Sequence, residues 1–142
     1  MDKEPFFQEL VAFTASVHQI TTDITKDVRS ESVTLLQYKI LEYIAVRQPL
    51  TLSDISECMH ISLPNASREL KKLIEKNLCQ KTAAPGDRRK QYVQLTEEGA
   101  VMMEEAFRVI RERFMVRIAG VPEQELADLQ QAIRLLQTKV FY

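Results

Sequence analysis

Helix and turn signals are concentrated between residues 53 and 95. Ser62 and Pro64 favour a helix start, because Ser caps first-turn N–H groups and Pro lacks an N–H that would have no partner there. Asn77 suits the left-handed residue that ends a helix, and Pro-Gly-Asp at 85–87 marks a turn. The pattern predicts helices at 53–60 and 63–76, and strands at 78–84 and 91–95 joined by residues 85–90. This order describes a winged helix-turn-helix, a shape that grips duplex DNA.

Basic residues gather in the same stretch. Between Ser62 and Lys90 the chain has eight Lys or Arg residues and three Asp or Glu residues, a net charge of +5. Because the whole chain carries −1, the remainder carries −6. A basic patch on an acidic body favours a polyanionic partner. An ordinary solvated surface is the alternative, but it does not explain why the charge gathers on one helix and the hairpin tip.

The expected DNA contacts fall into three groups. Base reading is assigned to the front of the second helix, where Asn can pair with adenine and Arg with guanine: Ser62, Pro64, Asn65, Ser67 and Arg68. Phosphate contacts are expected from hydroxyl and amine groups: Thr51, Ser53, Lys71, Lys72 and Lys90. At the hairpin tip, beside Arg88, we expect Arg89 to enter the minor groove. Asp87 is expected either to orient Arg89 or to cap the turn.

Apolar stripes with steps of three and four residues lie near both ends of the chain. The residues that we assign to dimerisation on these stripes are Phe6, Leu10, Phe13, Val17, Leu126, Leu129, Ile133 and Leu136. Stripes of this length need partner helices. We therefore expect a single chain, mainly α with a small β-wing, in which dimerisation helices at 5–29 and 97–142 flank a DNA-binding region at 33–96. A further helix is predicted at 32–47.

Residues 87–99 read DRRKQYVQLTEEG. This segment resembles the wing signature of the MarR family of bacterial transcription regulators: Asp, an Arg two residues later, strand residues, Leu-Thr, and a Gly three residues after the Thr. Ser67-Arg68 and the residues around Asn77 resemble the recognition helix and its exit, although the family usually has Gly at the position of Asn77. The order of elements agrees over nearly the whole chain.

The resemblance implies a homodimer that binds double-stranded DNA at an inverted-repeat operator. It further implies a repressor, or sometimes an activator, released by a small molecule, often an aromatic acid or another amphipathic toxin. Effector contacts are assigned to three residues by their positions on apolar faces: His18, Tyr38 and Phe107.

Other classes of function find less support in the sequence. There is no Gly-rich phosphate loop, metal-ligand cluster or nucleophile–base pair, so we expect no enzyme activity, cofactor or metal. Cys58 and Cys79 form no CxxC motif and are expected to be reduced, with a cysteine-based redox regulator as the alternative. A winged helix that binds only protein is a second alternative. With no run near the roughly 20 apolar residues of a membrane span, and no signal peptide, a cytoplasmic location is expected.

Overall fold

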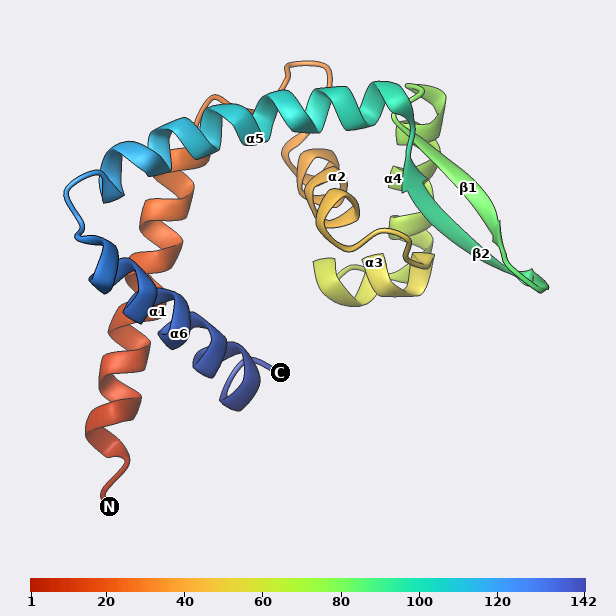
Figure 1. The fold of residues 1–142 in the computed structure, drawn as a ribbon. Coiled ribbons are helices and arrows are strands. Elements are labelled where there is room, and N and C mark those ends of the chain that lie inside the picture. Colours follow the sequence, from red (N-terminus) through yellow and green to blue (C-terminus); the bar gives the residue numbers. More distant parts are fainter. The chain divides into compact units, whose positions relative to one another are not determined.

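The computed structural model describes residues 1–142, and its elements follow the predicted order (Figure 1). The fold is mainly α with a small antiparallel sheet, as predicted. The helices are α1 (Glu4–Thr25), α2 (Leu35–Arg47), α3 (Leu52–Met59), α4 (Leu63–Glu75), α5 (Glu97–Ile118) and α6 (Glu123–Lys139), and the strands are β1 (Cys79–Ala84) and β2 (Asp87–Leu95). The chain forms two compact units, Met1–Ile110 and Arg111–Tyr142, and the boundary falls within α5. None of the helices combines the length and apolar character that crossing a bilayer requires.

Short-range caps start both helices of the helix-turn-helix. The Thr51 hydroxyl accepts a hydrogen bond from Asp54 N at 3.2 Å, and the Asp54 carboxylate accepts one from Thr51 N at 2.9 Å. Ser62 Oγ accepts from Asn65 N at 3.2 Å. Each cap satisfies N–H groups that have no partner within the helix. Both predicted helix starts are therefore confirmed to within a residue.

Two predicted helix boundaries are wrong. The helix expected from residue 32 begins at Leu35, because Thr34 and Gln37 form a reciprocal capping box there. The helix expected to reach residue 29 ends at Thr25. Two residues later Asp27 takes a φ of 63°, a left-handed conformation that cannot continue an α-helix.

The wing is a hairpin with a shorter tip than predicted (Figure 1). β1 pairs antiparallel with β2 from Cys79↔Leu95 to Ala84↔Asp87, and an irregularity beside Ala84 absorbs three extra residues of β2. The second strand consequently begins at Asp87 rather than 91, and the turn contains only Pro85 and Gly86. Beside the hairpin, Leu50 forms a single antiparallel bridge with Val93.

The core of the first unit combines α2, α3, α4, the wing and the start of α5. Its fully buried side chains include Ile40, Leu41, Ile44, Ile55, Leu70 and Leu73. α4 buries one apolar face in this core, with Ala66, Leu70 and Leu73 buried and Ile74 partly buried. Met103 and Ala106 of α5 are also buried in this core, so it extends past the expected boundary at residue 96.

The first turn of α5 lies against the backbone that leads into the wing. Thr96 N donates to Leu78 O at 3.1 Å, and Thr96 Oγ donates to Asn77 O at 2.7 Å. Thr96 Oγ also accepts from Gly99 N at 3.0 Å, which caps α5. A Cβ on Gly99 would overlap the carbonyl oxygen of Leu78. Glycine at position 99 therefore permits this close approach.

The terminal helices keep their apolar faces exposed within one chain. Neither α1 nor α6 contains a buried residue. In α1, Phe6 and Phe13 are each 49% exposed, and in α6 Leu129 and Ile133 are 51% and 54% exposed.

Candidate nucleic-acid interface

Helix α4 turns its polar side toward solvent. Four of the side chains predicted to read bases are exposed: Pro64, Asn65, Ser67 and Arg68. Lys71 and Lys72, which are predicted to contact phosphate, are exposed as well. Ser62 is exposed as well, but its oxygen already accepts the α4 cap hydrogen bond. Its hydroxyl hydrogen remains available for a DNA acceptor. The residues predicted for this surface thus share one face of one helix.

The two phosphate contacts assigned to the start of α3 differ in exposure. Ser53 is exposed, whereas Thr51 is half-buried and engaged in the α3 capping box. The Thr51 hydroxyl can still donate one hydrogen bond. Both residues lie at the positive end of the α3 dipole, where an anion is favoured.

The cations of α4 differ in their partners. Lys72 Nζ pairs with Glu69 Oε1 at 3.2 Å, whereas Arg68 and Lys71 form no ion pair. Desolvation raises the pKa of Glu69, but hydrogen bonds from Gln37 and Lys72 and the charge of Lys72 outweigh it and hold that pKa below its usual range. Glu69 is therefore ionised at neutral pH, and it offsets part of the Lys72 charge.

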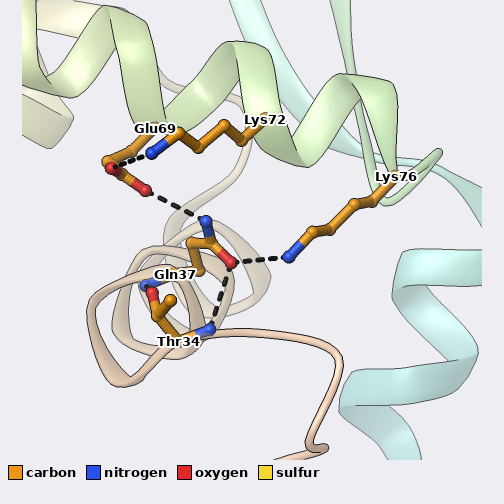
Figure 2. A network of polar contacts seen from close by, with 5 residues as sticks. All are labelled: Thr34, Gln37, Glu69, Lys72 and Lys76. Atoms are coloured by element: carbon orange, nitrogen blue, oxygen red, sulfur yellow. Dashed lines mark hydrogen bonds and ion pairs between the residues drawn. The ribbon is translucent and has the colours of Figure 1, made fainter.

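Behind this face, a buried amide joins α4 to α2 (Figure 2). Gln37 is only 2% exposed. Its Nε2 donates to Glu69 Oε2 at 3.1 Å, and its Oε1 accepts from Thr34 N at 3.1 Å and from Lys76 Nζ at 2.9 Å. Sequence reasoning did not identify Gln37, although Thr34-x-x-Gln37 fits the capping-box pattern and would have placed it at the start of α2.

At the wing tip, the structure separates the two roles considered for Asp87. Asp87 Oδ1 accepts a hydrogen bond from Arg89 N at 2.9 Å, so its carboxylate caps the turn. The Arg88 and Arg89 side chains are exposed and form no ion pair. Lys90 Nζ lies 5.4 Å from the centre of the Tyr92 ring, a cation–π distance that holds the Lys90 side chain along β2.

A pocket of about 480 Å³ lies between α1, the turn that follows it and α2, all within the first unit. Of the three residues assigned to an effector, His18 and Tyr38 line it. Phe107 does not; it packs partly buried against the core. The Tyr38 hydroxyl is buried with no hydrogen-bond partner. Desolvation, followed by the negative charge of Glu42, raises the pKa of Tyr38 to about 12, so the hydroxyl is neutral and able to donate.

The two cysteines lie in different environments. Cys58 on α3 is exposed, whereas Cys79 at the start of β1 is buried. Burial raises the pKa of the Cys79 thiol to about 12, which suppresses its reactive thiolate. No group of three or more His, Cys, Asp or Glu side chains is arranged to hold a metal ion.

Known proteins share this architecture. A family model described as MarR family matches residues 33–90. The HTH-type transcriptional regulator TcaR of Staphylococcus aureus (strain Newman) is 23% identical over 137 residues, which cover 94% of this chain and 89% of TcaR. YdgG of Bacillus subtilis (strain 168), an uncharacterised HTH-type transcriptional regulator, is 28% identical over 137 residues, covering 94% of this chain and 87% of YdgG.

A solved structure agrees with the fold. A MepR mutant from a multidrug resistant S. aureus clinical isolate superposes with a TM-score of 0.73 at 19% identity, covering 93% of this chain and 96% of MepR. The matched family domain contains α2, α3, α4 and the wing tip, which carry the exposed cations described above. The family consists of regulators rather than enzymes. Residues 33–90 therefore match the MarR family of transcription regulators, and relatives named HTH-type transcriptional regulators match over 94% of the chain.

Proposed function

We propose that this regulator is a repressor that binds an inverted-repeat operator as a homodimer and leaves it when a small amphipathic molecule binds. The observation that carries the DNA-binding part is a set of four exposed cations without ion pairs, two on α4 and two at the wing tip: Arg68, Lys71, Arg88 and Arg89. Phosphate oxygens would replace water around these charges and release counterions from the duplex. Asn65 and Arg68 lie at the front of α4, from which a recognition helix reads the major groove.

The dimer rests on the terminal helices. Both expose about half of several large apolar side chains, such as Phe13 of α1 and Ile133 of α6. A second copy that covers these faces would remove apolar surface from water, at about 25 cal/mol per Å². Two-fold symmetry then presents two copies of α4 to half-sites whose centres are about 10–10.5 bp apart.

Release by an effector rests on the pocket beside α2. It has room for a small aromatic molecule and contains one polar group without a partner, the Tyr38 hydroxyl. The charged residues of the lining balance, with three cations and three carboxylates, so the pocket suits an amphipathic ligand of low net charge: Lys26, Arg29, Lys39, Asp23, Asp27 and Glu42. The related MepR has been solved bound to ethidium bromide and, as a mutant, to an oligodeoxyribonucleotide, with TM-scores of 0.65 and 0.58.

Selection of duplexes from a random pool by the purified protein tests this function, followed by footprinting of variants on the selected sequence. Arg68→Ala should cost about 1–3 kcal/mol and relax preference at one base pair in each half-site. Lys71→Ala, which removes a cation without breaking an ion pair, should weaken binding to all sequences alike and lower the salt slope by about one for each phosphate that is no longer neutralised. Arg89→Ala should weaken binding most on A·T-rich flanks.

The variants also define the outcome that would reject this role. If Arg68→Ala and Lys71→Ala gave the same uniform loss on every duplex, α4 would not read bases. If the wild type selected no sequence and bound all duplexes weakly, a winged helix that binds protein would be the better explanation.

A further inference from the structure

We propose that Gln37 is a positioning residue that sets the orientation of the recognition helix α4 and thereby the discrimination between DNA sequences. Gln37 itself lies on α2 and is buried, so it does not touch DNA. The inference rests on the proposed reading of bases by α4.

Gln37 contacts α4 at Glu69 and at its C-cap residue Lys76, whose amine also donates to Ser32 O. Glu69 accepts from the amide nitrogen of Gln37, and Lys76 donates to its amide oxygen (Figure 2). Residues seven apart in an α-helix lie nearly on one line along its surface, because two turns contain 7.2 residues. Two contacts on such a line fix both the rotation of α4 about its axis and its position along α2.

The hydrogen bonds also hold Gln37 itself in place. Its amide oxygen accepts a third contact, from Thr34 N, within the capping box that starts α2. With one amide hydrogen bonded to Glu69 and two donors bonded to its oxygen, the side chain has little freedom to rotate. Position 37 therefore connects the rigid start of α2 to α4, and does more than fill space in the core.

A small rotation of α4 would be enough to change sequence reading. Arg68 neighbours Glu69 on α4 and is exposed. A rotation of α4 by about 20° moves side-chain atoms at an outer helix radius of about 5–6 Å by about 2 Å. Hydrogen bonds to base edges tolerate far smaller displacements before they weaken steeply. Contacts between flexible Lys side chains and phosphate tolerate larger displacements. A rotated α4 should therefore lose discrimination between DNA sequences before it loses affinity for DNA in general.

Gln37→Glu is the decisive variant, because it changes one contact and retains the others. Glu serves equally well at this position of a capping box, and its carboxylate still accepts from Thr34 N and Lys76. Toward Glu69, however, it replaces a donor by a second negative charge. Adding Glu69→Gln restores a donor–acceptor pair with the roles exchanged. Gln80→Glu is the matched control, since it adds the same charge at an exposed site on β1.

The measured quantity is the ratio of Kd for a scrambled duplex to Kd for the duplex selected by the wild type, at constant salt. Gln37→Glu should lower this ratio about tenfold, within the range of coupling between contacting residues. The double variant should restore it to within about twofold of the wild type. Gln80→Glu should weaken both affinities alike and leave the ratio unchanged.

Thermal melting shows whether each variant is folded. If Gln37→Glu does not fold, two changes at the partner residue give the same test: Glu69→Gln keeps an acceptor for Gln37 and should keep the ratio, whereas Glu69→Leu removes it and should lower the ratio. An unchanged ratio in folded Gln37→Glu, or a double variant that fails to restore it, overturns the role of Gln37. A wild type that selects no sequence refutes the proposed function instead, and this inference with it.

Discussion

Replacing Gly99 by Ala should destabilise the protein, although Ala is the better helix former. A Cβ at position 99 would overlap Leu78 O and lie 3.0 Å from Leu78 C and 3.3 Å from Leu78 Cα. These are backbone atoms, which cannot rotate away as the end of a side chain can. The first turn of α5 would therefore have to move outward from the chain segment that leads into the wing.

The magnitude follows from three terms. Forcing a methyl group into a packed site costs about 1–3 kcal/mol. The displaced turn also weakens the hydrogen bonds from Thr96 to Leu78 O and Asn77 O, at about 0.5–1.5 kcal/mol each. The helix preference for Ala over Gly returns about 0.5–1 kcal/mol. The net expectation is a loss of about 3 kcal/mol in the free energy of unfolding, or about 6–12 °C in Tm for a chain of this size.

Urea denaturation at one fixed protein concentration measures this loss, as a lower midpoint with an unchanged m-value. Gly120→Ala is the matched control, because a Cβ there would meet no heavy atom within 4 Å. It should change stability by less than about 0.5 kcal/mol. Equal stability of the Gly99→Ala and Gly120→Ala variants would refute the close-approach argument.

Four further predictions concern other parts of the molecule. Iodoacetamide at pH 8 should modify Cys58 in the folded protein and spare Cys79, whose pKa burial raises to about 12; mass spectrometry showing equal labelling of both would contradict this. Light scattering at micromolar concentration should give twice the chain mass of 16.4 kDa, and a stable wild-type monomer would exclude the proposed homodimer. Ile133→Asp should split or unfold the dimer. Tyr38→Phe should retain or raise the stability of the protein, because it removes a buried hydroxyl without a partner. The same change should weaken the binding of any aromatic acid found by thermal-shift screening. A ligand whose affinity does not change does not use the pocket as proposed. Because the pKa of Glu69 is lowered in the fold, its network stabilises the protein above the unfolded pKa of about 4.3, and this effect is lost as pH falls through the lower folded pKa. Glu69→Gln should therefore reduce the loss of stability as pH falls below about 4.3, and an unchanged pH profile would contradict this.

Local chemistry was enough to predict most of the elements. Ser62 caps the helix expected of it, because a cap needs only a hydroxyl and an N–H three residues away, and Thr51 and Thr96 cap α3 and α5 in the same way. Asn77 takes a φ of 60°, the left-handed conformation predicted for it. The residues that the sequence assigned to base reading on α4 lie on its exposed side. The family resemblance added the wing signature that ends in Gly99, but not the reason for a glycine there.

Contacts between elements distant in sequence could not be predicted in this way. Gln37 binds Glu69 and Lys76 only because the core packs α2 against α4, and nothing within four residues of position 37 implies it. The same holds for the approach of α5 to Leu78 and for the Tyr38 hydroxyl, which packing buries without a partner. Even the start of α2 was misplaced, since Ser32 and Thr34 are both acceptable caps and the pairing of Thr34 with Gln37 decides between them. Hydrogen bonds within one helical turn follow from neighbouring residues, whereas those between helices depend on how the apolar faces pack together.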